Sequence, residues 1–186
     1  MTTMTPEEMI AEYKEIHKNP SLSKGTALLK HIPEIARLVN MLDCKTILDY
    51  GCGKAYFWKD FKHWRALMNN VPRSVQLYDP AIPEFEEMPE GRFDMVICTD
   101  VLEHVHPSET DNFLKTLFLY TRQCLFINVS TIPAKKTFKD GTNLHVNLRT
   151  IDQWEKKIHE IRSWYGDKYK SFPAVVVRFD EEIGRF

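Results

Sequence analysis

The stretch from Thr46 to Lys54, Thr-Ile-Leu-Asp-Tyr-Gly-Cys-Gly-Lys, restricts the possible folds more than any other part of the chain. Its first half predicts a short apolar strand, Lys45–Tyr50, that runs directly into a turn bracketed by two glycines. After the turn, apolar side chains predict a helix over Tyr56–Asn69, because they recur at helical spacing at Phe57, Phe61, Trp64 and Met68. A strand, a tight glycine turn and a helix form the first half of a βαβ unit, so the sequence predicts an α/β fold.

A glycine turn at this place is suited to binding a ligand. Gly51 and Gly53 lack side chains, so the backbone can adopt angles that other residues avoid and a ligand can approach it closely. The following helix points free N–H groups at such a ligand, and Asp49 adds a carboxylate near the strand end. A plain strand-to-helix connection gives the same pattern, so the turn alone does not decide the function.

Two later stretches favour a site for a nucleotide-like cofactor. The first, Val75–Asp79, predicts a strand that ends in an acidic residue. The second, Phe93–Val105, predicts a buried strand over Asp94–Thr99 that is followed by Asp-Val-Leu-Glu-His-Val. Together with the glycine motif Leu48–Ala55, these stretches resemble the class I S-adenosylmethionine-dependent methyltransferases. The resemblance extends from about position 29 to about position 154.

The resemblance implies a fold, a cofactor and a reaction. The implied fold is a Rossmann-like three-layer αβα sandwich with a mostly parallel central sheet. The implied cofactor is S-adenosylmethionine, which becomes S-adenosylhomocysteine when its methyl group is transferred. The family motifs say little about the acceptor, but the near-minimal size of the chain and its net charge of −1 favour a small molecule. Two other interpretations fit the same motifs: a module that binds the cofactor without catalysis, and an enzyme that cleaves the cofactor.

The resemblance places the cofactor contacts at the carboxyl ends of the strands. Asp79 suits both ribose hydroxyls, although an aspartate before Pro80 also suits a turn. Asp49 is expected near the cofactor's amine and sulfonium, and Lys54 either assists the methionine carboxylate or is simply solvated. The full expected set is Asp49, Tyr50, Gly51, Cys52, Gly53, Lys54, Asp79, Pro80, Ile82, Thr99, Asp100 and Val101.

The segment Pro80–Gly91 departs from the family pattern. The usual pattern has a helix and an outer strand here, but three prolines and a glycine leave no room for both. We therefore expect a trimmed sheet without that strand. The adenine then has no clear acidic partner, and Ile82 or Phe85 is expected to pack against it.

The other segments complete a single domain over residues 1–186, with an N-terminal helical cover over 1–43 and a Rossmann-like core over 44–180. Thr5 begins the first cover helix with a capping box, and Pro33 is expected to split the second, Thr26–Leu42, near Ile32. In the core we expect a helix from His106, a strand over Cys124–Val129, a helix from Thr150 and a strand over Ala174–Phe179.

The long polar loop Ser130–Arg149 is the expected lid over the substrate, together with the cover helices. Methyl transfer needs alignment and a dry pocket more than covalent help from the protein. Candidate groups for moving a proton are His104, His106, His145 and Asp100, although each histidine also suits a structural role. The candidate substrate contacts are Lys24, Glu103, Asn128, Lys135, Lys136 and Asn143.

No metal site is predicted. Glu103 and His104 form a pair like one that binds a metal in some relatives, but two ligands are too few for a site. The activity is therefore expected to survive chelators.

Composition limits the partners and the compartment. The formal net charge is −1, so the chain lacks the overall positive charge that would attract it to nucleic acid or to an anionic membrane surface. The four cysteines form no Cys-x-x-Cys pair and are expected to be buried free thiols, at Cys44, Cys52, Cys98 and Cys124. With no apolar run of membrane-spanning length and no signal-peptide pattern, we expect a cytoplasmic monomer or small homo-oligomer that contacts neither nucleic acid nor membrane.

Overall fold

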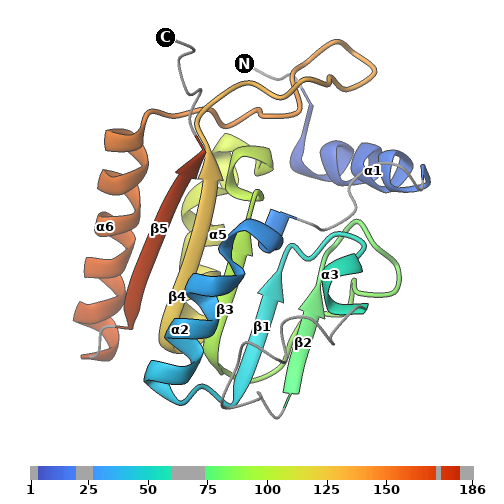
Figure 1. The fold of residues 1–186 in the computed structure, drawn as a ribbon. Helices are drawn as coiled ribbons and strands as arrows, with labels where there is room; N and C mark the ends of the chain where they lie inside the picture. The colour runs from blue at the N-terminus through green and yellow to red at the C-terminus, as the bar shows by residue number, and fades with distance from the viewer. Residues whose placement is uncertain (1–3, 20–26, 60–73, 171–172, 181–186) are drawn as a thin grey trace, which may run out of the picture.

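The fold is built on one five-stranded parallel sheet (Figure 1). The structure, a computed structural model, describes residues 4–19, 27–59, 74–170 and 173–180. The strands are β1 (Thr46–Tyr50), β2 (Ser74–Tyr78), β3 (Phe93–Thr99), β4 (Thr121–Ser130) and β5 (Ala174–Asp180). They lie in the order β2-β1-β3-β4-β5, and every neighbouring pair is parallel. The predicted α/β fold with a trimmed parallel sheet is confirmed.

Helices cover both faces of the sheet, as the apolar strands require. Successive strand residues point to opposite faces, so Ile47 packs toward α2 (Ile32–Leu42) and Leu48 toward the other side. That other side is covered by α5 (Thr110–Tyr120) and α6 (Ile151–Tyr169). The side chains that fill this second layer are fully buried and include Leu114, Leu117, Phe118 and Trp154.

The segment between β2 and β3 contains neither a helix nor a strand; residues 79–92 form turns followed by irregular loop. The expected loss of the outer strand is therefore confirmed, and β2 forms one edge of the sheet. Strand order reverses beside β1, because the chain passes from β1 outward to β2 and then returns to β3 on the other side. Ligands of open parallel sheets bind at the carboxyl ends of the strands at such a reversal.

The first N-terminal helix begins where the sequence predicts, and the predicted start of the second, at Thr26, lies outside the described residues. Helix α1 (Pro6–His17) has the capping box at Thr5, and a 3₁₀ turn (Ala27–His31) precedes α2. The expected split near Ile32 is confirmed, because Pro33 has no backbone N–H to continue the preceding turn. Helix α3 is described over Tyr56–Lys59, and the rest of the predicted helix lies outside the described residues.

Helix α1 stands apart from the sheet and packs on the loop between β4 and α6 (Figure 1). Met9 of α1 shares a small buried cluster with two apolar side chains of this loop, Phe138 and Leu144. The helix and the loop therefore form a cap beside the carboxyl ends of the strands. Within the described residues, no helix combines the length and the apolar character that crossing a bilayer requires.

All four cysteines are buried free thiols, as expected. The helix predicted from His106 begins instead as a 3₁₀ turn over Pro107–Glu109, and the α-helical part starts at Thr110. The side chain of His106 accepts a hydrogen bond from the backbone N–H of Ser108 and so caps this turn.

The turn after β1 restricts position 51 to glycine, and this restriction can be tested. The φ of Gly51 is +91°, and a Cβ atom there would lie 2.3 Å from Cγ2 of Val101. Gly51→Ala should therefore lower the free energy of unfolding by about 2–4 kcal/mol, because left-handed backbone strain and steric overlap add. Chemical denaturation measures this loss.

The matched control is Gly91→Ala. Gly91 has φ +81° but open space around its α-carbon, so alanine there should lose only the backbone part, about 1–2 kcal/mol. Adding Val101→Ala to Gly51→Ala should recover part of the larger loss. Equal losses for the two glycine variants would show that Val101 does not restrict this position.

Candidate active site

A cavity of about 760 Å³ lies at the carboxyl ends of β1, β2 and β3, beneath α1. One side is formed by the glycine turn and by the turn after β2, and the other by the segment after β3. Helix α1 contributes Met9, Tyr13 and His17 to its wall. The predicted site residues that line the cavity are Tyr50, Gly51, Gly53, Asp79, Pro80, Thr99, Asp100, Val101, His104 and His106.

Asp79 holds two turns of the cavity together. One carboxylate oxygen accepts a hydrogen bond from the backbone N–H of Gly53 at 2.9 Å, and the other accepts one from Ala81 at 2.9 Å. The glycine turn is also fixed by Tyr78, whose carbonyl oxygen accepts from the backbone N–H groups of Gly51 and Cys52. Each Asp79 oxygen keeps a second lone pair, so the carboxylate can still accept from a ligand hydroxyl.

Asp49 is a buried carboxylate with incomplete hydrogen bonding. Its Oδ2 atom accepts from the indole N–H of Trp58 at 2.5 Å, while Oδ1 is buried without a partner. Burial raises the pKa of Asp49 to about 7, against the opposing effect of the Trp58 hydrogen bond. A nearby positive charge would favour the ionised form, so this position suits a cationic ligand.

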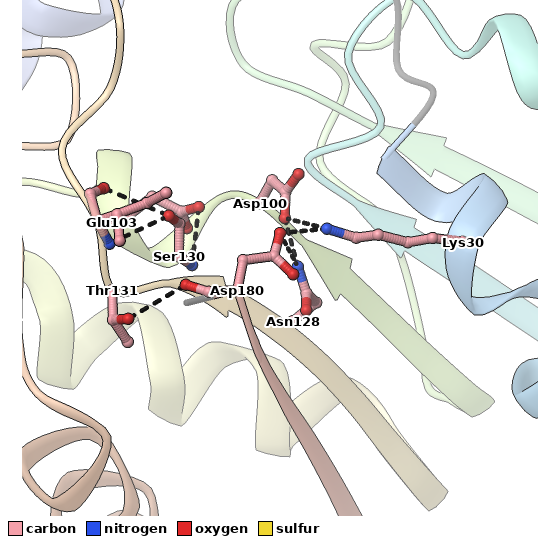
Figure 2. Close-up of polar contacts among 8 residues, drawn as sticks. Lys30, Asp100, Glu103, Asn128, Ser130, Thr131 and Asp180 are labelled. Atoms are coloured by element: carbon pink, nitrogen blue, oxygen red, sulfur yellow. Dashed lines mark hydrogen bonds and ion pairs between the residues drawn. The ribbon is translucent and has the colours of Figure 1, made fainter. Parts of the chain in front are cut away.

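Asp100 lies directly after β3, in the left-handed region with φ +55°. Figure 2 shows its carboxylate facing Lys30 and the side-chain amide of Asn128, which donates a hydrogen bond to it. Lys30 Nζ is 3.8 Å from Asp100 Oδ1 and also pairs with Asp180 at the end of β5. Burial raises the pKa of Asp100, although the charge of Lys30 opposes the shift. Lys30, on the 3₁₀ turn Ala27–His31, therefore connects the N-terminal segment to the carboxyl ends of β3 and β5.

Glu103 is fully buried behind the cavity wall. Its Oε1 accepts a hydrogen bond from the backbone N–H of Ser130 at 3.1 Å (Figure 2), and its Oε2 has no hydrogen-bond partner. Burial, reinforced by the charge of Asp100, raises the pKa of Glu103 to about 8.

His104 joins the cavity wall to the cap. Its Nδ1 lies 2.8 Å from the hydroxyl of Tyr13 and 3.0 Å from the carbonyl oxygen of Leu144. The ring centroids of His104 and His145 are 4.7 Å apart, so the cap loop brings the two imidazoles together. Burial, together with the charge that His145 can carry, lowers the pKa of His104 to about 4, and the ring is neutral at pH 7.

Several predicted residues lie outside the cavity wall. Asn143 makes its hydrogen bonds inside the loop. Its side-chain oxygen accepts from the backbone N–H groups of Ala134 and His145, and its Nδ2 donates to the carbonyl oxygen of Ala134. Lys135 and Lys136 are exposed loop residues, and Lys24 lies outside the described residues. The predicted cofactor contacts Asp49, Cys52, Lys54 and Ile82 do not line the cavity either, and Ala81 takes the lining position next to Ile82.

Sequence reasoning missed two side chains at this site. Tyr13 lies on the first helix, and nothing in its spacing shows that its hydroxyl meets His104. Lys30 gave no signal either, because the two aspartates it approaches, Asp100 and Asp180, are far away in the sequence. Both contacts depend on how the N-terminal segments fold back over the strand ends.

Comparison with known proteins identifies the family. The sequence profile of a family described as "Methyltransferase domain" matches residues 18–168. Among curated proteins, none matches the chain significantly. A similar solved structure is the Burkholderia thailandensis 1,6-didemethyltoxoflavin-N1-methyltransferase, crystallised with bound 1,6-didemethyltoxoflavin and S-adenosylhomocysteine. It is 16% identical, with a TM-score of 0.54 over 87% of this chain and 81% of that one.

The solved structure supports the fold, and the family match covers most of the chain. The resemblance seen in the glycine motif and in the segment after β3 is confirmed. The protein therefore belongs to the methyltransferase domain family and is an S-adenosylmethionine-dependent methyltransferase.

Proposed function

We propose that the protein transfers the methyl group of S-adenosylmethionine to a small-molecule acceptor inside this cavity. The observation that carries the proposal is the shape of the site: a single cavity joins the glycine turn and Asp79 to the polar segment Thr99–His104, under the cap of α1. Its volume of about 760 Å³ is typical of sites for cofactors and small ligands. The bound 1,6-didemethyltoxoflavin of the Burkholderia enzyme supports a small acceptor.

The cofactor end of the cavity fits S-adenosylmethionine. Asp79 offers carboxylate lone pairs for the ribose hydroxyls, and the glycine turn lets the main chain approach the ligand. The unpartnered Oδ1 of Asp49 fits a neighbouring positive charge, which the cofactor carries on its amine and its sulfonium. When bound, the cofactor supplies an electrophilic methyl group on a cationic leaving group.

The acceptor end lies against the segment after β3. We assign the acceptor's contacts to Thr99, Asp100 and His104, which line the cavity there. Asp100 is the candidate base for an acceptor that must lose a proton, and Lys30 and Asn128 hold its carboxylate in place. The cap of α1 and the loop excludes water, which favours displacement at the methyl carbon over side reactions. His106 is assigned a structural role, because its ring caps the following turn.

The remaining proposals concern partners and location. With a formal net charge of −1, we propose that the enzyme acts on neither nucleic acid nor membranes. We also propose that it is cytoplasmic and a monomer or small homo-oligomer.

Methyl transfer to a small molecule is tested with labelled cofactor. The enzyme is incubated with S-adenosylmethionine labelled in its methyl group and a cell extract, and the products are separated by size. Label is expected in the small-molecule fraction, in a compound other than the cofactor and its breakdown products. Label found in protein or nucleic acid instead would refute the proposal.

Asp79→Ala should weaken binding of S-adenosylmethionine by about 2–4 kcal/mol, because the ribose loses charge-assisted hydrogen bonds and the glycine turn loses its anchor. Isothermal titration calorimetry measures the affinity. The control is Asp43→Ala, because Asp43 is exposed and precedes β1 at the opposite end of the strand. Unchanged affinity in a folded Asp79→Ala protein would remove Asp79 from the cofactor site.

Asp49 should make the stability of the ligand-free protein depend on pH. Its pKa is raised from an ordinary value near 3.8 to about 7, so the folded state binds a proton that the unfolded state has released. The free energy of unfolding should therefore fall as pH rises from about 5 to about 7, by about 1.4 kcal/mol per pH unit from this group.

The comparison variant for this measurement is Asp49→Asn, which cannot titrate. The difference in free energy of unfolding between the wild type and Asp49→Asn should change over that pH range and level off above about pH 7. Saturating S-adenosylmethionine should reduce this change, because a positive neighbour favours the carboxylate. A difference that stays constant with pH would show that Asp49 titrates in its ordinary range.

A further inference from the structure

Three side chains that can bind a metal meet where the cap joins the cavity wall. Glu103 and His104 lie on the 3₁₀ turn Leu102–His104 after β3, and His145 comes from the loop between β4 and α6. One ligand-type atom of each residue lies within 4.8 Å of the other two. The sequence offered only the adjacent pair, and the folded loop supplies the third member.

The hydrogen bonds of both histidines leave the same ring nitrogen free. Nδ1 of His104 bonds to the carbonyl oxygen of Leu144 at 3.0 Å, and Nδ1 of His145 bonds to that of Ile132 at 2.5 Å. A carbonyl oxygen only accepts, and the Tyr13 hydroxyl, 2.8 Å from Nδ1 of His104, already donates to the Leu144 carbonyl at 3.0 Å. With the partners arranged in this way, each Nδ1 carries the proton and each Nε2 keeps its lone pair. Metal-binding histidines have this arrangement, in which a backbone carbonyl fixes the ring and the other nitrogen binds the ion.

The carboxylate of Glu103 is buried but only half of it is hydrogen-bonded. Oε1 is satisfied by Ser130, but Oε2 is buried and has no hydrogen bond. Within the described ranges, no Lys or Arg side chain forms an ion pair with Glu103. A buried oxygen without a partner usually costs about 1–3 kcal/mol, and a bound cation would remove that cost.

We propose that Glu103, His104 and His145 bind one divalent transition-metal ion, of the class of Zn²⁺, Mn²⁺ or Fe²⁺. Two imidazoles favour these ions over Mg²⁺ and Ca²⁺, which prefer oxygen ligands. Bonds of about 2.1 Å require the three ligand atoms, which lie within 4.8 Å of one another, to move closer together when the ion binds. This replaces the sequence-based expectation of no metal site and of activity that survives chelators, because tertiary structure supplies the ligand that sequence spacing did not reveal.

The position of the site indicates what the ion does. Three protein ligands leave at least one coordination position open, as in catalytic rather than structural sites. His104 lines the cavity, so an ion on its Nε2 adjoins the acceptor end. This role rests on the proposed methyl transfer. In that reaction, the ion binds an oxygen or nitrogen atom of the acceptor and holds it in line with the methyl group. The acceptor therefore carries a metal-coordinating group.

Metal binding is tested without cofactor or acceptor, so its outcome is independent of the proposed reaction. Chelator-treated protein is titrated with Zn²⁺ by calorimetry, and with Co²⁺ by visible absorption. The wild type should bind one ion per chain. His145→Ala and Glu103→Gln should each weaken Zn²⁺ binding at least about 100-fold, since they remove a direct ligand or its charge. The control is His159→Ala, because His159 is an exposed histidine on α6 and should not affect binding.

Tyr13→Phe distinguishes a metal site from ordinary packing. The Tyr13 hydroxyl contacts Nδ1 of His104 but is not a ligand, so its loss should weaken Zn²⁺ binding by about tenfold while the fold persists. Circular dichroism of each variant establishes that it is folded, and Glu103→Gln keeps an oxygen that can accept from Ser130. Absence of Zn²⁺ binding in the wild type, or equal affinity in wild type, His145→Ala and Glu103→Gln, overturns the site.

Azide tests the open coordination position. Added to the Co²⁺-loaded protein, azide should change the visible spectrum by binding at the free position, and His145→Ala should not show the same Co²⁺ spectrum. A Co²⁺ spectrum that azide leaves unchanged would overturn the proposed contact between ion and acceptor, although the ion site itself would stand. Lack of methyl transfer in the labelled-cofactor experiment, with Zn²⁺ still bound, would refute the enzyme function and leave the metal site.

Discussion

The hydrogen bonds accepted by the Asp79 carboxylate are the interaction on which the shape of the cavity beside β1 and β2 depends. The carboxylate accepts backbone hydrogen bonds from Gly53 and Ala81 and so connects the turn after β1 to the turn after β2. The two strands are paired in parallel, which brings both turns to one edge of the sheet. Because β3 lies on the other side of β1, the reversal of strand order leaves space there for a ligand.

Buried oxygen atoms without hydrogen-bond partners gather at this same edge. Asp49 Oδ1, Glu103 Oε2 and Asn128 Oδ1 are all buried without a hydrogen-bond partner. Asp49 and Asn128 lie near the carboxyl ends of β1 and β4, and Glu103 lies on the turn after β3. Each such atom costs about 1–3 kcal/mol in a folded protein. These unpartnered oxygens lower the stability of the ligand-free protein, and a bound positive charge near Asp49 or Glu103 would offset that loss, as proposed above for the cofactor and the ion.

The cap gives the second half of the site its shape. Helix α1 and the loop between β4 and α6 share a small apolar cluster, and Tyr13 links them to His104 through its hydroxyl. Lys30 forms a comparable link from the 3₁₀ turn before α2 to Asp100 and Asp180 (Figure 2). N-terminal segments therefore complete a site whose other residues lie on the sheet edge, and changes in either segment directly affect His104 or Asp100.

The sequence by itself determined the strands, the glycine turn, the missing outer strand and the split before α2. Those features follow from local periodicity and from the backbone limits of glycine and proline, which act within a few residues. Only the tertiary structure decided the contacts of Tyr13 with His104, of Lys30 with Asp100, and of His145 with the Glu103–His104 pair. Each joins segments that are far apart in sequence, and nothing in residue spacing encodes how a loop of polar residues folds back over a sheet.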